Sequence, residues 1–238
     1  MTKKSIFLLF IVMAIVAGAI TVYIMMTPKA FYSEDEIIEN MDYLTQEMEV
    51  LEVIQLDEKT YLVPLLLNGG ESYGSSIWVW SGWKWECVGA TTASDPQIIV
   101  NEGNSYIYWN VHPQDEVHEW EFYLTSERNY SVTTVGDDNQ VEVYYPKIQM
   151  KNSVEFGKES YGYVEMPSEW KDVIGAFDSF PAETGFIPSS HSYMYQWQAY
   201  NDDGESIRLE HTFRNGGGGS YGGNYFFHMS QLDPENLE

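Results

Sequence analysis

Four tryptophans within residues 77–88 constrain the fold of this chain more than any other stretch. Two runs of aromatic and β-branched residues flank a Ser-Gly pair, which is typical of a two-residue β-hairpin loop. The expected pairs are Trp80 with Trp83 and Trp78 with Trp85. All four side chains would share one face, because side chains alternate along a strand. That face would cover roughly 600–1,000 Å², more than the roughly 300–600 Å² patch of a typical soluble monomer. It is therefore either a packed core or a recognition surface.

The N-terminal segment predicts a membrane anchor. Residues 6–26 contain no charged side chain and match the ~20 residues that a helix needs to cross a bilayer. A cleaved signal peptide is the alternative, with Ala17-Gly18-Ala19 as its cleavage site. The apolar run continues beyond that site, which favours an uncleaved signal anchor. Since Lys3 and Lys4 precede the run, the positive-inside rule predicts a single-pass protein of the cell membrane, with a cytoplasmic N-terminus and an extracytoplasmic C-terminal domain.

The charge of the remaining chain restricts its partners. All 36 acidic residues follow the apolar run, with 10 of the 12 basic ones, so this part carries a formal charge of −26. Nucleic acid is excluded, because its binding relies on Lys and Arg that neutralise phosphates. A basic patch on another envelope protein, or a divalent cation, is electrostatically permitted. Cys87 is the single cysteine, so no internal disulfide forms and the core must supply the stability.

The remaining pattern predicts a mainly β protein. Residues 1–27 form the cytoplasmic tip and anchor, residues 28–50 an amphipathic helix that begins at the capping box Ser33–Glu36, and residues 51–238 one extracytoplasmic domain. Short alternating segments separated by turns predict an antiparallel sandwich or distorted barrel. One or two accessory helices are expected, one of them near residues 168–178. The glycine-rich residues 216–223 are expected to form a loop.

One hairpin tip carries candidate metal ligands. His112, Asp115, Glu116 and His118 lie close together in the sequence, and imidazoles and carboxylates are ligands for zinc or manganese. A solvated turn is the simpler interpretation of the same residues. Acidic turns at residues 137–139 and 202–205 offer oxygen ligands for calcium, but neither has EF-hand spacing. No cofactor is predicted beyond such a divalent cation.

Residues 70–74 match the G-x-S-x-G pattern of serine hydrolases, with Ser72 at its centre. That chemistry needs a sharp strand-to-helix turn, whereas here the next residues predict a strand. The pattern therefore indicates a turn preference rather than a nucleophile.

Taken together, the Lys-Lys pair, the anchor, the single cysteine, the acidic aromatic-rich β domain and the stretch from Trp109 to Pro113 resemble membrane-anchored extracytoplasmic proteins of unassigned function in Gram-positive bacteria. The resemblance implies a localisation and no active site.

Three functions remain open at this point. The favoured one is non-catalytic binding or scaffolding of another envelope protein, with recognition by loops on a rigid sheet. The alternatives are a glycan-binding module that uses Trp78, Trp80, Trp83 and Trp85 as an exposed platform, and an extracytoplasmic hydrolase. Burial of the tryptophans, or catalytic groups gathered in one cleft, would discriminate among them.

Overall fold

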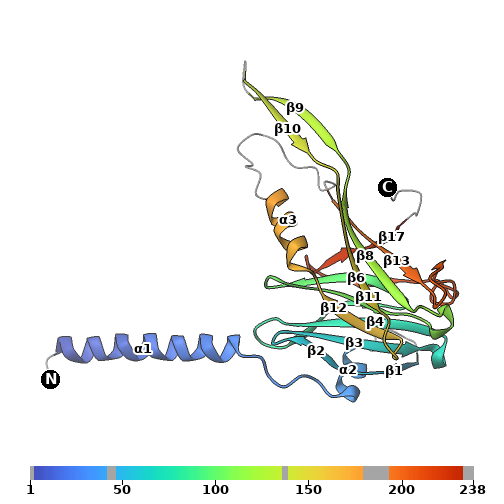
Figure 1. Ribbon diagram of the computed structural model, residues 1–238. Helices are drawn as coiled ribbons and strands as arrows, with labels where there is room; N and C mark the ends of the chain where they lie inside the picture. The colour runs from blue at the N-terminus through green and yellow to red at the C-terminus, as the bar shows by residue number, and fades with distance from the viewer. Residues whose placement is uncertain (1–2, 42–46, 136–138, 179–192, 233–238) are drawn as a thin grey trace.

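The computed structural model describes residues 3–41, 47–135, 139–178 and 193–232. These residues form mainly antiparallel β-structure, as predicted, with the helices α1 (Lys3–Met26), α2 (Glu34–Asn40) and α3 (Ser168–Asp178). Figure 1 shows α1 projecting away from the β-rich body. Among the described residues, no helix reaches the combination of length and hydropathy that crossing a bilayer requires, so the predicted transmembrane span is not supported.

Three largely antiparallel sheets form the body. The first sheet contains β1 (Met48–Val50), β2 (Ile54–Asp57), β3 (Thr60–Leu67), β4 (Ser72–Trp80), β5 (Trp85–Thr91) and β15 (Gly219–Tyr221). The middle sheet contains β12 (Tyr161–Glu165), β7 (Asn104–Asn110), β6 (Ser94–Asn101) and β16 (Phe226–His228). The third sheet contains β11 (Ile148–Glu155), β8 (Glu119–Ser126), β13 (Met194–Tyr200), β14 (Ser206–Ile207) and β17 (Ser230–Gln231), which pairs with β13 in parallel.

The middle sheet is buried on both faces. Ile107 and Trp109 pack toward the third sheet, where they meet Trp120 and Phe122. Tyr108 alternates with them and packs toward the first sheet. The side chains of this strand therefore alternate between two cores, and the body is a stack of three β layers rather than a two-layer sandwich. A strand with apolar or aromatic side chains on both faces can be covered from both sides.

Helix α2 covers the outer face of the first sheet and is shorter than predicted. Ile37 and Met41 are fully buried against Trp78 and its neighbours. Ser33 caps the helix in the predicted capping box. The chain is already extended at Met48, which pairs with Leu67, because backbone pairing to an existing sheet edge outweighs a weak helical period there.

The third sheet extends into a two-stranded ribbon that projects from the body (Figure 1). It consists of β9 (Asn129–Val135) and β10 (Asn139–Tyr145). Ser126 pairs with Ile148 and Asn129 pairs with Tyr145, so β8–β11 and β9–β10 share one continuous register. The acidic turn predicted at residues 137–139 lies largely outside the described residues.

Two later predictions have different outcomes. Helix α3 occupies the predicted residues and buries Trp170 in the core between the middle and third sheets. The glycine-rich segment is only partly a loop, because Gly219–Tyr221 pairs with β5 as β15. The remaining short helical turns are η1 (Asn68–Gly70) and η2 (Pro113–Asp115).

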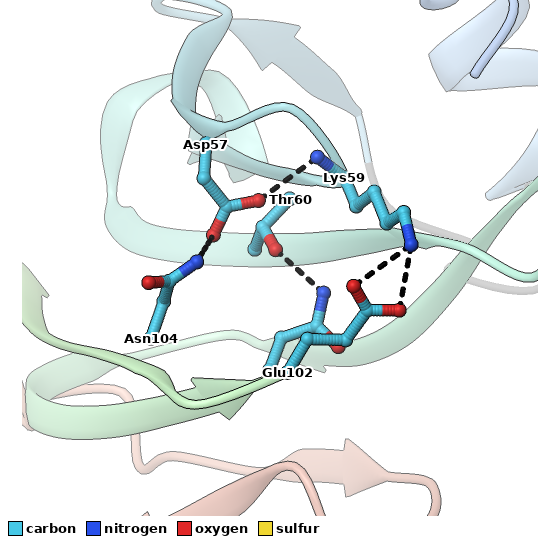
Figure 2. A network of polar contacts seen from close by, with 6 residues as sticks. Asp57, Lys59, Thr60, Glu102 and Asn104 are labelled. Carbon is cyan, nitrogen blue, oxygen red and sulfur yellow. Dashed lines mark hydrogen bonds and ion pairs between the residues drawn. The ribbon is translucent and has the colours of Figure 1, made fainter. Parts of the chain in front are cut away.

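A polar network joins the tip of the β2–β3 hairpin to the tip of the β6–β7 hairpin (Figure 2). Lys59 Nζ lies 2.8 Å from both carboxylate oxygens of Glu102 at the surface. Deeper in the body, Asn101 Nδ2 donates to Thr60 Oγ1 over 2.8 Å, and both residues are buried. Asp57 Oδ2 accepts from Asn104 Nδ2 at 3.2 Å. These contacts tie the first sheet to the middle sheet at one end.

Candidate functional site

The tryptophan hairpin has a longer loop than predicted. Trp80 pairs with Trp85, and Trp78 pairs with Cys87, so residues 81–84 form the loop. Trp78, Trp80 and Trp85 still share one face, but that face is buried beneath the segment that leads into α2. Trp83 lies in the loop and is 65% exposed. Three of the four proposed binding residues are therefore core side chains, and the four do not form one exposed platform.

An open groove of ≈ 620 Å³ runs beside this hairpin. Tyr32, Trp85 and Tyr225 give it aromatic walls, and Lys84 and Glu86 lie on its lining as a surface ion pair. Its remaining lining residues are Asn40, Trp78, Cys87, Val88, Ser220, Gly222 and Gly223. The volume lies within the ~300–1,000 Å³ of ordinary ligand sites.

Backbone contacts hold the groove walls in place. Trp85 Nε1 donates to the Lys29 carbonyl at 3.0 Å, and Tyr32 Oη donates to the Trp85 carbonyl at 3.3 Å. On the opposite wall, Gly222 N donates to the Val88 carbonyl at 2.7 Å. The N-terminal segment and the glycine-rich segment, which are far apart in sequence, are thus both fastened to the same strand, β5.

Helix α2 lies beside this groove, because Tyr32, two residues before the helix, and Asn40, its last residue, both line the groove. Glu34, Asp35 and Glu36 occupy its first turn, where the helix dipole favours carboxylates. The hydrogen bond from the Ser33 backbone lowers the pKa of Glu36. The groove therefore combines aromatic walls with an acidic flank.

The predicted metal ligands do not converge. Both carboxylate oxygens of Asp115 accept hydrogen bonds, from His211 N at 2.7 Å and from Thr212 N at 2.9 Å. This buried carboxylate therefore links its own loop to the loop that contains His211 and Thr212. His118 Nδ1 lies 2.6 Å from Asp202 Oδ1 instead. Glu116 is exposed.

His112 likewise has other neighbours than the predicted ligands. Its Nδ1 accepts from Gln114 N at 3.0 Å, and its ring lies beside His211, with the ring centroids 5.6 Å apart. Across the described part of the chain, no three His, Cys, Asp or Glu side chains form a group that fits a metal ion. The 202–205 turn is held by Asn201 Oδ1, which accepts from the backbone N–H groups of Asp203 and Glu205.

Ser72 is the buried first residue of β4, so it is followed by a strand, as the sequence indicates. The neighbouring Tyr73, rather than Ser72, contacts the His112 ring. The backbone here lacks the strand-to-helix turn that exposes a nucleophilic serine.

A buried polar network surrounds Gln97 and was not predicted from the sequence. Tyr108 Oη and Tyr221 Oη both donate to Gln97 Oε1, at 3.1 and 3.0 Å. The Gln97 amide is hydrogen-bonded to the carboxyl of Asp95. Burial raises the pKa of Tyr108 well above its usual value, so this hydroxyl remains a donor.

The position of Asp95 results from an irregularity in β6. The pairing with β7 shifts between Ser94 and Gln97, which inserts a β-bulge at Asp95-Pro96. Burial raises the pKa of Asp95 to about 6, while its hydrogen bond to Gln97 acts in the opposite direction. The Asp-Pro pair within an apolar strand was the available sequence signal, because proline inside a sheet marks an edge or a bulge.

Comparisons with known proteins give no assignment. The chain matches no family model, no curated protein and no solved structure.

Proposed function

We propose that this protein is a non-catalytic binding module, held at the outer face of a cell membrane by residues 6–26, that docks a basic surface of another envelope protein. The observation that carries the proposal is the groove beside the tryptophan hairpin, with its aromatic walls and its acidic flank on α2. Aromatic side chains contribute strongly at protein interfaces, and an acidic border attracts a basic partner.

The charge of the groove lining and of the whole chain also favours a basic partner. Among the residues that the structure describes, Lys84 is the one basic residue that lines the groove, and its charge is offset by Glu86 at 3.3 Å. The chain as a whole has a net charge of −24. Electrostatic attraction of this kind speeds association and weakens at high ionic strength.

Anchoring rests on the sequence of residues 6–26, which contain no charged side chain. Phe7, Ile15 and Tyr23 are exposed apolar or aromatic side chains of this segment, which forms α1. Confinement to a membrane surface raises the effective concentration of the module toward other membrane-associated proteins.

Neither alternative is favoured by a specific observation. A hydrolase that uses Ser72 needs this side chain exposed beside a base, and Ser72 is buried in β4. A tryptophan platform needs several exposed rings, and of the four hairpin tryptophans only Trp83 is exposed.

Cross-linking on intact cells tests the proposal. The full-length protein should capture one reproducible envelope protein with a basic surface, and less of it at high salt. A triple variant with Glu34→Gln, Asp35→Asn and Glu39→Gln should reduce capture, because it removes charge from the groove flank while leaving the Ser33–Glu36 capping box intact. A matched variant with Glu127→Gln, Glu155→Gln and Glu159→Gln removes the same charge elsewhere and should capture normally. Equal loss in both variants, or no reproducible partner, would contradict the proposal.

A further inference from the structure

Strand β11 (Ile148–Glu155) presents the longest open edge of the three-layer body. It is an end strand of the third sheet, and β8 is the one strand of the described chain that pairs with it. The other end strands of the three sheets contain at most five residues each among the described residues. A long open edge carries a row of backbone donors and acceptors that can pair with a strand of another molecule.

The backbone groups of β11 alternate in direction. Phe156 N donates to the His118 carbonyl over 2.7 Å, which directs the backbone of the even-numbered residues of β11 toward β8. The N–H and C=O groups of Lys151, Ser153 and Glu155 therefore point away from β8. No other residue in the described part of the chain forms a hydrogen bond with these outward backbone groups.

The charges on the solvent face of β11 leave one acidic pair without a cation. Lys151 forms an ion pair with Glu121 of β8, yet its side chain is 51% exposed. Glu155 lies directly opposite Glu119 of β8. Within the described ranges, neither Glu155 nor Glu119 forms an ion pair with a cation. Like charges opposite each other are destabilising, so a cation beside Glu155 would stabilise this end of the strand.

We infer that β11 pairs with β11 of a second copy of this chain, antiparallel and about a twofold axis at Ser153. In this register Lys151 of each copy lies opposite Glu155 of the other. Each pair matches two residues whose backbone groups face outward, so both backbone hydrogen bonds of the pair can form. On the core face, Met150 lies opposite Phe156, and each is half-buried at the border of the core of its own chain. A methionine sulfur beside an aromatic ring adds a favourable contact.

The charges select this register among the possible ones. An axis at Lys151 would place two lysines opposite each other, and an axis at Glu155 would place two carboxylates opposite each other. Axes at residues 152 and 154 would leave both charges opposite uncharged residues. An edge lysine normally blocks the addition of a strand. Here it excludes other registers and is neutralised in the one centred on Ser153, which occurs twice because the contact is symmetric.

Cysteine cross-linking of the full-length protein in detergent micelles tests the inference. In a Cys87→Ser background, Ser153→Cys places two thiols opposite each other, at the ~5.5 Å Cα separation that a disulfide can span. Mild oxidation should produce a covalent dimer on a non-reducing gel. Gln149→Cys on the same strand is the matched control, because its counterpart in the second copy lies roughly 27 Å away. Cross-linking at both positions, or at neither, would overturn the inference.

Charge exchange tests the register without an added cysteine. At 0.15 M salt, where the net charge is largely screened, Glu155→Lys should weaken dimerisation by about 10-fold or more, because both ion pairs become like-charge pairs. Lys151→Glu should weaken it similarly. An equimolar mixture of the two variants regains both ion pairs and should form heterodimers with the wild-type affinity, as measured by analytical ultracentrifugation.

Two results of this experiment would contradict the interface: unchanged dimerisation of Glu155→Lys, and no recovery in the mixture of folded variants. Lys151→Glu also breaks the contact with Glu121, so circular dichroism must show that it folds. If it does not fold, Glu155→Lys and the cysteine pair decide the question without it.

The dimer and the proposed envelope partner can fail independently. The control variant of the capture experiment contains Glu155→Gln, which removes both ion pairs between the two copies. We expect this variant to dimerise more weakly and still to capture the partner. The α2 triple variant should dimerise like the wild type and capture less of the partner.

Discussion

The side-chain amide of Asn110 donates to the carbonyl of Gly74 over 2.6 Å, from the middle sheet to the first. The same Nδ2 donates to the Leu65 carbonyl at 3.1 Å, and Asn110 Oδ1 accepts from Ser160 Oγ at 2.9 Å. Asn110 is fully buried, so one amide satisfies polar groups of three segments where water has no access.

Asn110→Ala should therefore destabilise the protein. It leaves the hydroxyl of Ser160 and two backbone carbonyls without this partner, and each unpaired buried group costs roughly 1–3 kcal/mol. We expect a loss of about 2–4 kcal/mol in the free energy of unfolding by urea. Asn224→Ala, at an exposed turn, is the matched control and should change stability by less than about 0.5 kcal/mol. Similar values for both variants would refute the role of Asn110.

Gly74→Ala should destabilise the protein strongly, although it adds only one methyl group. A Cβ at this position would lie 2.2 Å from the Thr91 carbonyl oxygen and 2.9 Å from Leu67 Cδ1. Because backbone of β5 is in the way, the strands must separate, at a cost of about 1–3 kcal/mol or more. Gly157→Ala has open space around its Cβ and serves as the control. Thermal unfolding of the two variants side by side measures the difference, and a stable Gly74→Ala protein would show that the sheets pack differently.

The polar network of Figure 2 contains one buried contact and one exposed contact, which can be tested separately. Asn101→Ala removes the buried hydrogen bond to Thr60 and should cost about 1–2 kcal/mol at any ionic strength. Lys59→Met removes the ion pair with Glu102, whose carboxylate is largely exposed, and should cost less than about 1 kcal/mol. We compare each variant with the wild type by urea unfolding at low and high salt. The difference in unfolding free energy should shrink at high salt for Lys59→Met and stay constant for Asn101→Ala. The reverse order of costs would contradict the assignment.

Asp95 should make stability fall as the pH rises. Its folded-state pKa of about 6 lies above its usual value of 3.8, so the folded state holds this proton more tightly than the unfolded state. Its contribution is most favourable below pH ~4 and is lost as the pH rises through about 6. The stability of Asp95→Asn relative to the wild type should increase by at most about 3 kcal/mol between pH 4 and pH 7. Unfolding across this range measures the change, and a constant difference would contradict the raised pKa of Asp95.

Trp83 should dominate the solvent-accessible tryptophan emission. All eight tryptophans lie within the described residues, and the other seven are at most 6% exposed. Trp83→Phe should remove most of the emission that acrylamide quenches and shift the remainder to shorter wavelength. Trp80→Phe is the matched control at a buried position of the same hairpin. Strong quenching that persists in Trp83→Phe would show that the tryptophan core is open.

The sequence predicted the parts of the fold that depend on neighbouring residues. The short alternating strands, the capping box at Ser33 and the helix near residues 168–178 were predicted correctly, because each depends on local periodicity or on side chains within one turn. The shared face of Trp78, Trp80 and Trp85 was also predicted, even though the loop between the strands has four residues rather than two. Whether this face is core or exposed stayed open in the sequence, and the structure shows that it is buried.

The candidate site was less predictable, because its residues meet only through long-range pairing. His112 and His118 are close in sequence, yet the imidazole near His112 is that of His211. Asp115 looked like a metal ligand, but its oxygens are occupied by a loop almost a hundred residues later. The metal-site hypothesis for these residues, for which a solvated turn was the simpler interpretation, required that sequence neighbours also face one another.

By itself, the sequence determined the acidic charge, the apolar N-terminal run, the single cysteine and the dominance of β-structure, all of which are properties of composition and short-range pattern. Only the tertiary structure decided that the body has three β layers, that the glycine-rich segment pairs with β5, and that Asp95 lies beside Trp197. The physical reason is that strand partners and the shift of a register by one residue at a bulge are settled by packing between distant segments. A one-residue shift moves a side chain to the opposite face of the sheet, and the conformational preferences of neighbouring residues do not determine whether the shift occurs.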